Sequence, residues 1–358
     1  MQKKKMTVMV LPAGASCNLA CRYCYHGKLQ KESHRHIMPL ETFQKIVEDS
    51  RSLSYAIDFL WHGGEPLLTG IPWYQTAMDI QKRVDFKGPV RNVIQTNGTL
   101  INREWTQFFA VNHFLIGISM DGPQNLHDAN RCHRRGRGTF REVMQGIENL
   151  RAAKRAFGVI TVVTRGNVKY PEEVYSAIRV SGARSCAFHF YSSEGTADAE
   201  KFAPTSKDLL RFFKEVLRLW FAEDNPSFMI RDFQNIIRVV CGGTPLDCAS
   251  NNNHCRRFVA VMPDGEVYPC HRFIGKQEFR LGNVHDTDLT TIYRRARHIY
   301  DRLAELPQKC MSCRWLKMCG GGCAHERYTA SGTFASTHPQ CQVRKELFKY
   351  LTSRVPRV

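Results

Sequence analysis

The stretch Cys17-Asn18-Leu19-Ala20-Cys21-Arg22-Tyr23-Cys24 decides the fold and carries the clearest chemical signal in the sequence. Its three cysteines have the spacing C-x3-C-x2-C, and no fourth cysteine follows nearby. Thiolates are soft ligands that hold iron–sulfur clusters, and a four-iron cube bound by three cysteines leaves one iron open to a non-protein ligand. The stretch therefore predicts a metal centre at which chemistry can occur.

A zinc knuckle, or three buried and inert cysteines, is the alternative interpretation of this stretch. Structural zinc sites usually close with four ligands in C-x2-4-C pairs, which the stretch does not supply by itself. With the aromatic Tyr23 before its last cysteine, it resembles the signature of the radical S-adenosylmethionine (radical SAM) enzymes. That resemblance implies cleavage of S-adenosylmethionine to a 5′-deoxyadenosyl radical, which abstracts hydrogen from an unactivated carbon.

Composition places the chain among globular proteins. Its 358 residues, 43% of them hydrophobic, suffice for one large domain and a smaller one. No stretch approaches the roughly 18 apolar residues of a membrane span. The apolar run Met6–Leu11 is too short for an export signal and ends in a proline, and the 14 cysteines cluster at metal-ligand spacings. We therefore expect a reduced, cytoplasmic protein without a membrane partner.

The formal net charge of +18 indicates anionic partners without specifying them. Five arginines crowd the segment 131–141, which could be a solvated face. We predict instead that this segment is a docking surface for an acidic peptide. The sequence carries no aromatic-rich RNA-binding signature, so nucleic acid is not an expected partner.

The first two thirds of the chain alternate short β-rich runs with longer amphipathic stretches, which indicates βαβ units and a parallel sheet. The expected strands are Met6–Leu11, Ile57–Trp61, Val93–Thr96, Phe114–Ser119, Gly158–Thr164 and Ser185–Phe190. The expected helices are Leu40–Leu53, Pro72–Val84, Asn102–Ala110, Thr139–Ala153, Pro171–Ile178 and Ser206–Phe221. This α/β pattern alone also fits a doubly wound sheet, whereas the radical SAM resemblance implies a partial (β/α)6 barrel related to the TIM barrel. We expect the barrel to occupy residues 1–225 and a cysteine-rich domain to occupy residues 226–358.

Reactive residues of parallel α/β folds collect on loops at the carboxyl ends of strands. The motif His62-Gly63-Gly64-Glu65-Pro66 follows the second expected strand. Most such glycine pairs are simply turns, although glycines also let backbone approach a ligand closely. The motif resembles the Gly-Gly-Glu-Pro segment of radical SAM enzymes, which binds the amino group of S-adenosylmethionine.

Two further turn-like stretches follow the third and fourth expected strands, at Gln95–Thr99 and Ser119–Pro123. They resemble stretches that line the cofactor site in the anaerobic sulfatase-maturating enzymes and related peptide modifiers, where the serine contacts the ribose. The resemblance thus implies a site for S-adenosylmethionine made of Tyr23, Gly63, Gly64, Glu65, Pro66, Asn97 and Ser119.

Cysteines accumulate beyond residue 240 at a spacing that resembles the SPASM domain. Seven spaced cysteines and one upstream thiolate suffice for two four-cysteine clusters. By this resemblance Cys248, Cys255, Cys270 and Cys323 hold a first auxiliary cluster, and Cys310, Cys313, Cys319 and Cys341 a second. With the cluster of Cys17, Cys21 and Cys24, the chain would carry three [4Fe–4S] clusters. Cys241 competes with Cys248, and Cys132 and Cys186 are expected to be structural.

Enzymes with this domain mostly act on peptides or protein side chains, so the resemblance implies such a substrate. In sulfatase-maturating enzymes an aspartate that serves as base follows the Tyr-Pro-Cys stretch, whereas His271 follows Tyr268-Pro269-Cys270 here. We therefore predict a maturase of ribosomal peptides that forms a carbon–carbon or thioether crosslink, with His271 as a catalytic base. Formylglycine formation in a sulfatase is the alternative, and a non-catalytic metal-binding module is a remote one.

Two partners besides the substrate are expected. A flavodoxin or ferredoxin would donate single electrons. The cluster motif begins at residue 17, so a leader peptide would be bound by another surface or by a separate protein.

Overall fold

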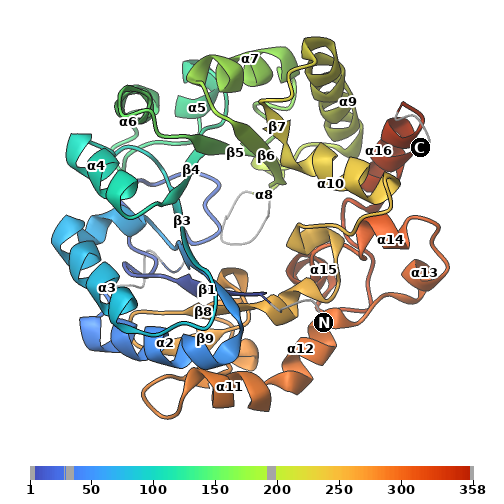
Figure 1. Cartoon of the computed structure of the whole chain (residues 1–358). Helices are drawn as coiled ribbons and strands as arrows, with labels where there is room; N and C mark the ends of the chain where they lie inside the picture. The colour runs from blue at the N-terminus through green and yellow to red at the C-terminus, as the bar shows by residue number, and fades with distance from the viewer. Residues whose placement is uncertain (1–4, 28, 30–35, 192–198, 355–358) are drawn as a thin grey trace.

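The computed structural model describes residues 5–27, 29, 36–191 and 199–354. One ten-stranded sheet runs through these residues, in the order β10-β9-β8-β1-β2-β3-β4-β5-β6-β7. Strands β1 to β7 are parallel and curve into an open barrel with helices on its outside (Figure 1). These strands are β1 (Lys5–Val10), β2 (Ala56–Trp61), β3 (Val90–Thr96), β4 (Leu115–Ser119), β5 (Phe157–Val163), β6 (Ser185–Phe190) and β7 (Met229–Ile230).

Helices connect the parallel strands, as crossover connections require. They are α2 (Leu40–Leu53), α3 (Ile71–Arg83), α4 (Arg103–Val111), α6 (Phe140–Ala152), α7 (Pro171–Ser181) and α9 (Ser206–Glu223), with the shorter α5 (Gln124–Asp128) and α8 (Ala199–Phe202). Apolar residues at helical spacing face the sheet, for example Phe43, Ile46 and Val47 of α2. The Asn102 side chain accepts from the backbone N–H of Trp105 at 2.9 Å and so fixes the start of α4.

Aromatic side chains fill the space between the first strands and their helices. Trp61 of β2 is fully buried, and its ring centroid lies 5.0 Å from that of Tyr74 in α3. Tyr74 in turn meets Trp105 of α4 edge-on at 5.4 Å. Such pairs add specific geometry to the hydrophobic gain of burial. This core holds the carboxyl ends of β2 and β3 in fixed positions.

The last third of the chain extends the sheet on its β1 side. Strand β8 (Phe258–Val261) pairs in parallel with β1, from Thr7 opposite Phe258 to Val10 opposite Val261. Strands β9 (Glu266–Tyr268) and β10 (Gly282–Asn283) continue outward in antiparallel pairing. The domain boundary expected at residue 225 stays a prediction, and strands beyond it lie at both ends of the sheet.

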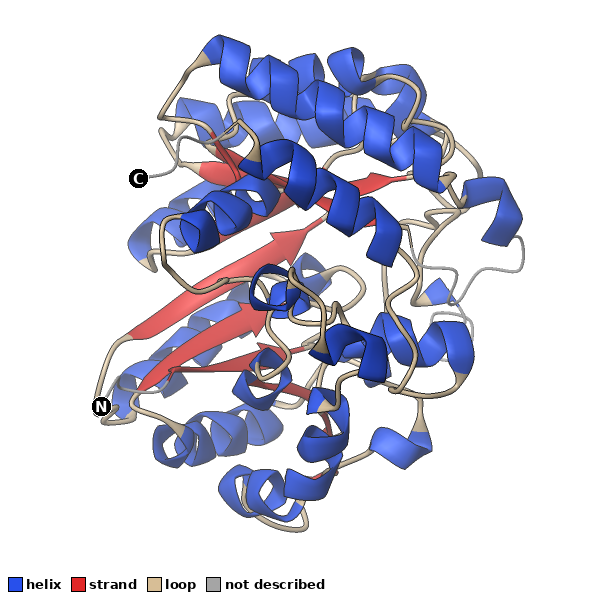
Figure 2. Ribbon diagram, turned by 90° about the vertical axis from the view of Figure 1, so that its right-hand side faces the viewer, coloured by secondary structure: helices blue, strands red, loops and turns tan. Residues whose placement is uncertain are grey.

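The remaining helices surround the open side of the barrel. They are α10 (Arg231–Val240), α11 (Leu289–Arg295), α12 (Arg297–Ala304), α13 (Gln308–Met311), α14 (Leu316–Cys319), α15 (Ala324–Ser331) and α16 (Cys341–Thr352). The C-terminal helix α16 packs against α9 and α10, and α11 packs against α2. Figure 2 shows the strands in the middle of the view, with helices above and below them.

The expected fold class is confirmed: the molecule is an α/β protein with a partial barrel. Helix α2 and strand β6 have the expected bounds, and the other expected strands are found within three residues of theirs. The attachment of β8, β9 and β10 to the sheet was not predicted. No helix within the described ranges has the length and apolar character needed to cross a membrane.

Candidate active site

The loop with the first three cysteines follows β1 and therefore lies at the carboxyl ends of the parallel strands. Backbone hydrogen bonds brace it against the segment 130–132. The N–H of Ala20 donates to the carbonyl of Cys132 at 2.7 Å, and that of Arg22 to the carbonyl of Asn130 at 2.9 Å. The predicted cluster ligands thus stand on a loop with a fixed backbone.

The three thiols of this loop lie near one another, on cysteines that are half-buried. Burial raises the pKa of the Cys17 thiol, and the nearby Glu65, Cys21 and Cys24 raise it further. Burial raises the pKa of Cys21 to about 12, against the opposing charge of Arg131. Thiolates crowded in a buried site are costly unless a cationic group binds them. The donor set therefore fits an iron–sulfur cluster.

Gly63 and Gly64 press the loop after β2 onto the turn that leads to Cys17. A Cβ on Gly64 would lie 2.0 Å from the carbonyl oxygen of Ser16, and one on Gly63 would lie 2.4 Å from that of Gly14. The N–H of Gly64 donates to Gly14 at 2.9 Å, and that of Glu65 to Ser16 at 2.8 Å. Any larger residue would separate the two loops, so the glycines fix the loop beside the cysteines.

Glu65 is fully buried and holds the ends of two strands together. Its Oε1 accepts from the N–H of Leu67 at 3.0 Å and from Oγ1 of Thr96 at 2.7 Å, and its Oε2 accepts from the N–H of Asn97 at 2.7 Å. Burial raises its pKa to about 7, against these hydrogen bonds. A carboxylate has about four acceptor positions, so one remains for a cationic ligand. Pro66 begins the short helical turn that Glu65 caps.

The other predicted cofactor residues lie along the same edge. Nδ2 of Asn97 donates to Oδ1 of Asn18 at 2.8 Å and lies 3.7 Å from Sγ of Cys17. Oγ of Ser119, at the end of β4, accepts from Nε2 of Gln95 at 3.1 Å. The structure thus brings the three predicted loops together beside the cysteines. Their role in binding a cofactor stays a prediction.

Tyr23 belongs to a buried network rather than to the open edge. Its hydroxyl donates to Asp121, and Nε of Arg131 donates to the same carboxylate at 2.9 Å. The Arg131 guanidinium lies 5.4 Å from the centre of the Tyr23 ring. Arg131 is only 7% exposed. The prediction that residues 131–141 form a docking surface is therefore wrong for Arg131. The exposed arginines of that segment are Arg134, Arg135, Arg137 and Arg141.

A second group of thiols forms from Cys248, Cys255, Cys270 and Cys323. Burial raises the pKa of the Cys248 thiol, and Cys323, Cys270 and Cys255 raise it further because they lie near it. Cys248 keeps accessible surface, although protein surrounds its thiol. Cys241 is exposed at the end of α10. Cys248 and Cys241 are both exposed residues, so the nearness of Cys248 to the other three thiols is what favours it over Cys241 as the fourth member of this group.

A third group forms from Cys310, Cys313, Cys319 and Cys341, which interact with one another in the same way. Among the described residues, no three His, Cys, Asp or Glu side chains are arranged to hold a single metal ion. A four-iron cube is larger than one ion, so its thiolates stand further apart. The metal held by each group and the ligand sets stay predictions.

Arg327 lies between the second and third groups of thiols. It is fully buried, and its Nη1 donates to the carbonyl of Glu305 at 2.8 Å. Burial lowers its pKa, whereas the nearby Cys310, Cys323 and Cys255 raise it. Negative charge at both thiol groups would therefore stabilise the buried guanidinium.

His271 follows Cys270 and faces the barrel. Its ring stacks on that of His62, with centroids 4.5 Å apart, and the rings of Tyr25 and His26 lie at 5.7 and 6.3 Å. Its Nδ1 lies 3.6 Å from Sγ of Cys270. Burial lowers the pKa of His271 well below its usual value, and the neighbouring His62 and His26 lower it further. The imidazole is therefore neutral near pH 7.

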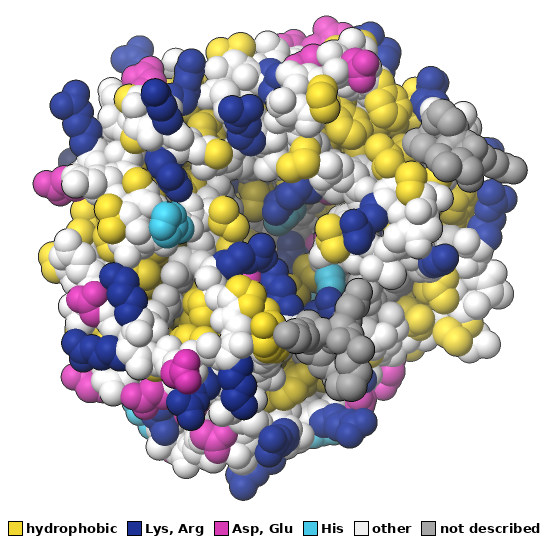
Figure 3. Space-filling view, viewed as in Figure 1, with side chains coloured by type: hydrophobic (Ala, Val, Ile, Leu, Met, Phe, Trp, Pro, Cys, Tyr) yellow, Lys and Arg dark blue, Asp and Glu magenta, His cyan; other side chains and the backbone are white. Residues whose placement is uncertain are grey.

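A hollow lies in the middle of the barrel face. Figure 3 shows this hollow, with Lys or Arg and His side chains inside it. Arg272 donates to Oε1 of Glu326 at 2.7 Å. His189 lies near the end of β6 and is an exposed residue, but surrounding atoms partly desolvate its ring. This desolvation, together with the charges of Arg272 and Arg231, lowers the pKa of His189 to about 3. Arg272 is thus paired with a carboxylate, and the imidazole of His189 is neutral near pH 7.

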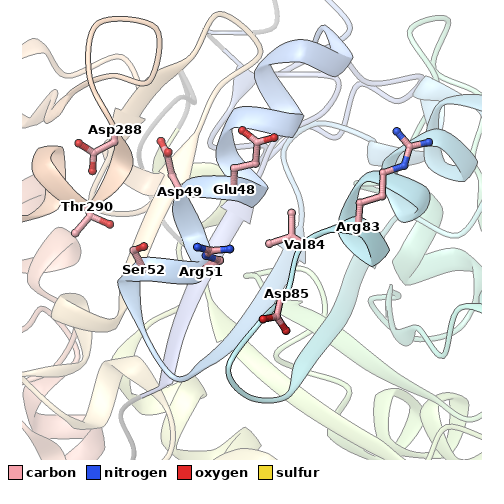
Figure 4. Close-up of a pocket in the computed structure, with 9 residues that line it drawn as sticks. All are labelled: Glu48, Asp49, Arg51, Ser52, Arg83, Val84, Asp85, Asp288 and Thr290. Carbon is pink, nitrogen blue, oxygen red and sulfur yellow. The ribbon is translucent and has the colours of Figure 1, made fainter.

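A separate pocket of about 560 Å³ lies at the amino ends of the strands. Its walls come from the ends of α2 and α3 and from the start of α11, and include Asp49, Arg83, Asp85 and Asp288 (Figure 4). This pocket lies at the opposite end of the strands from the loop that carries Cys17, Cys21 and Cys24. It therefore takes no part in the candidate site.

Sequence reasoning missed several residues of this site. His62 directly precedes the glycine motif and Arg272 directly follows His271, so adjacency to a motif was the available signal. Asp121 lies within the turn-like stretch Ser119–Pro123. Its contacts with Tyr23 and Arg131 join distant parts of the chain, so the local sequence did not predict them. Nothing in the local sequence marks Arg327.

Comparisons with known families agree with this arrangement. Residues 11–178 match the radical SAM superfamily model, and residues 253–314 match the SPASM model, an iron–sulfur cluster-binding domain. A serine-type anaerobic sulfatase-maturating enzyme of Bacteroides thetaiotaomicron is 32% identical over 92% of this chain and 85% of its own length. A cysteine-type enzyme of Clostridium perfringens is 29% identical over 98% of this chain and 97% of its own.

Solved structures of sulfatase-maturating enzymes are also similar to this chain. Native anSMEcpe with bound AdoMet superposes with a TM-score of 0.89 at 27% identity, covering 98% of both chains. The same enzyme with AdoMet and the Kp18Cys peptide gives a TM-score of 0.88 at 26% identity, again covering 98% of both chains. Streptococcus suis SuiB bound to the precursor peptide SuiA gives 0.69 at 16% identity over 95% of this chain and 76% of its own, which shows a shared fold alone.

Proposed function

Because the chain belongs to the radical SAM enzymes with a SPASM domain, which include the anaerobic sulfatase-maturating enzymes, we propose that it oxidises a side chain of a peptide or protein. The stack of His62 on His271 supports this most directly. His62 adjoins the glycine loop, and His271 adjoins Cys270. A substrate in the hollow would thus face the cofactor loops on one side and a thiol group on the other.

The cofactors proposed are S-adenosylmethionine and three [4Fe–4S] clusters, held by the three groups of thiols described above. When bound, S-adenosylmethionine and its cluster supply the 5′-deoxyadenosyl radical that abstracts hydrogen. Glu65 would accept from the amine of S-adenosylmethionine at its remaining acceptor position. A flavodoxin or ferredoxin in a reducing cytoplasm would supply the electron.

A proton and an electron must leave the substrate after a hydrogen atom is removed. The three carboxylates described above are already engaged: Glu65 by backbone and Thr96, Asp121 by Arg131, and Glu326 by Arg272. The neutral His271 imidazole can accept the proton instead. Alternatively, it donates to Sγ of Cys270 and tunes a cluster there.

For the product, we propose an intramolecular carbon–carbon or thioether crosslink in a ribosomal peptide. His271 supports it, because it stands where the resemblance puts the aspartate of sulfatase-maturating enzymes. Formylglycine formation is the second candidate, favoured by the relatives at 32% and 29% identity that span most of the chain. Leader binding would use an exposed surface of the chain or a separate protein.

Two peptide assays separate these products. The reduced, cluster-loaded enzyme is incubated with S-adenosylmethionine and a sulfatase-type Cys-x-Pro-x-Arg peptide, or with precursor peptides encoded beside its gene. A crosslinking enzyme removes two hydrogens from a precursor peptide and leaves the sulfatase peptide unchanged in mass spectra. Formylglycine in the sulfatase peptide would overturn the crosslink proposal and establish the second candidate.

Iron analysis tests the cluster assignment independently of the substrate. Three four-iron clusters predict about 12 irons per chain in anaerobically purified protein. Replacing Cys17, Cys21 and Cys24 by alanine should remove about four of them and abolish reductive cleavage of S-adenosylmethionine. Normal cleavage by that triple variant would refute the assignment.

A further inference from the structure

Arg327 is a fully buried cation on α15, one helical turn after Cys323. Its guanidinium donates to main-chain carbonyls: Nη1 to Glu305 at 2.8 Å and to Phe334 at 2.5 Å, and Nη2 to Leu303 at 3.4 Å. In the part of the chain that the structure describes, no ion pair joins it to a carboxylate. A buried charge of this kind is costly unless an anion lies beside it.

One N–H of this guanidinium, that of Nε, is buried and has no acceptor among the described residues. Native proteins rarely leave such a donor without an acceptor, and a bound ion or group is a usual reason for it. Nε of Arg344 in α16 shows the same feature. Nη2 of Arg344 donates to the carbonyl of Ala249, next to Cys248, at 3.1 Å and to that of Cys319 at 3.3 Å. Both arginines therefore lie where the second and third groups of thiols meet.

The anions that can lie beside Arg327 belong to these two groups. Leu303 and Phe334, which accept from its guanidinium, are part of a small hydrophobic core against which two cysteines of the second group pack. Burial lowers the pKa of Arg327, and negative charge on the thiols opposes this effect: Cys310 contributes most, two cysteines of the second group come next, and the exposed Glu305 contributes least. The surroundings of Arg327 thus fit anionic clusters at both groups.

We infer that Arg327 is the counter-cation shared by the clusters of the second and third thiol groups, and that its charge raises the reduction potential of both. Reduction adds one electron and no proton to a cluster, so the reduced form is more negative and gains more from a fixed cation. An N–H that donates to a cluster sulfur acts in the same direction. The inference rests on the proposed function, because it requires clusters at both groups.

The charge of Arg327 would then influence one step of the proposed reaction. After hydrogen abstraction, the substrate radical loses one electron, the cluster that receives it is reduced by one electron, and the proton leaves separately. A higher potential of the acceptor makes this transfer more favourable. Because Arg327 would act through the clusters, it is a positioning residue rather than a catalytic one.

The test is a redox titration, followed by electron paramagnetic resonance, of the cluster-loaded chain. Cys17, Cys21 and Cys24 are replaced by alanine in this parent protein, so that only the two shared clusters contribute to the spectra. Arg327→Gln removes the charge but keeps a donor for the carbonyls. It should make both clusters at least about tenfold harder to reduce, which is a shift of about 59 mV to lower potential for one electron. Arg327→Lys keeps the charge and should stay near the parent.

Arg302→Gln is the matched control, because it removes the same charge at an exposed position of α12 and lies over the ring of Phe334, at 5.8 Å from its centroid. Its potentials should equal those of the parent. Unchanged potentials in Arg327→Gln, equal shifts in Arg302→Gln, or an Arg327→Lys variant that shifts as far as Arg327→Gln would overturn the inference.

Iron content completes the test. Loss of iron from both Arg327 variants would overturn the inference, because it would show a purely structural role. Loss from Arg327→Gln alone would support it, because the charge would then be needed to hold the clusters. Failure of the proposed function is recognised separately: wild-type protein with clearly fewer than about 12 irons would lack an auxiliary cluster itself.

Discussion

The imidazole rings of His62 and His271 stack with centroids 4.5 Å apart and planes inclined by 26°. Nδ1 of His62 accepts from the backbone N–H of Gly63 at 2.7 Å, so the proton of the neutral ring is on Nε2. Burial, together with the charge of Arg272, lowers the pKa of His62 to about 4. Two neutral rings thus join the glycine loop of the barrel to the cysteine-rich part of the chain.

Replacing His271 by alanine should separate proton transfer from radical formation. If His271 is the base, 5′-deoxyadenosine is still formed, and product formation falls about 10²- to 10⁴-fold, the usual contribution of a general base. Both products are quantified by liquid chromatography and mass spectrometry at full iron content. If His271 only tunes the cluster, product forms more slowly and the cluster's reduction potential shifts. The variant His62→Phe, which keeps an aromatic ring beside His271, controls for loss of the stack.

Replacing Glu65 by glutamine should weaken S-adenosylmethionine binding about ten- to a hundredfold, because a hydrogen bond to a charged group is worth about 1.5–3 kcal/mol. Glutamine keeps the size of the side chain and one acceptor oxygen, so the iron content should not change. Calorimetry on the cluster-loaded protein measures the affinity. Glu41→Gln, at an exposed site in α2, is the matched control. Unaltered affinity in the Glu65 variant would make Glu65 a purely structural cap.

Asp121→Ala should destabilise the fold by about 3–5 kcal/mol, because it leaves the buried Arg131 charge without its partner. It also removes the acceptor of the Tyr23 hydroxyl and of the Val162 N–H, which donates to Asp121 at 3.0 Å. Urea unfolding followed by circular dichroism measures the change. Adding Arg131→Met to Asp121→Ala should recover part of the loss, whereas a double variant as unstable as the single one would contradict the unpaired-charge explanation.

The exposed arginines of residues 134–141 remain a proposed docking surface for an acidic leader peptide. Affinity for an acidic peptide should fall as salt rises, because exposed charges are screened over about 8 Å at physiological ionic strength. The variant Arg134→Glu/Arg135→Glu/Arg141→Glu should bind the peptide more weakly in fluorescence anisotropy. The control variant Lys309→Glu/Arg314→Glu/Lys317→Glu, which changes the net charge equally at other exposed positions, should bind it as the wild type does. An affinity that does not change with salt concentration would show that this face does not bind the acidic peptide.

Local sequence patterns predicted the barrel well because its strands and helices have clear periods. Strand β5 alternates buried and half-buried residues along its length, and Leu40–Leu53 has the apolar spacing of a helix with one buried face. The cysteine spacings likewise indicated three groups of thiols, which the structure brings together.

Local sequence patterns did not predict the contacts between distant parts of the chain. Thr7 pairs with Phe258, and no local signal connects residues so far apart in the chain. The same holds for His26, His62 and His271, which meet only because three separate loops converge. Arg131 was misassigned for this reason: an arginine-rich run is usually exposed, but Asp121 draws this side chain inside.

The pairing of β1 with β8 has a consequence for synthesis on the ribosome. Strand β1 emerges first, and β2 covers one of its edges early, but the partner of its other edge is made only after residue 257. Until then, Val8 and Val10 belong to an unpaired edge that can join another chain. The nascent protein thus passes through a long aggregation-prone interval, which chaperones or slow, cool expression would protect.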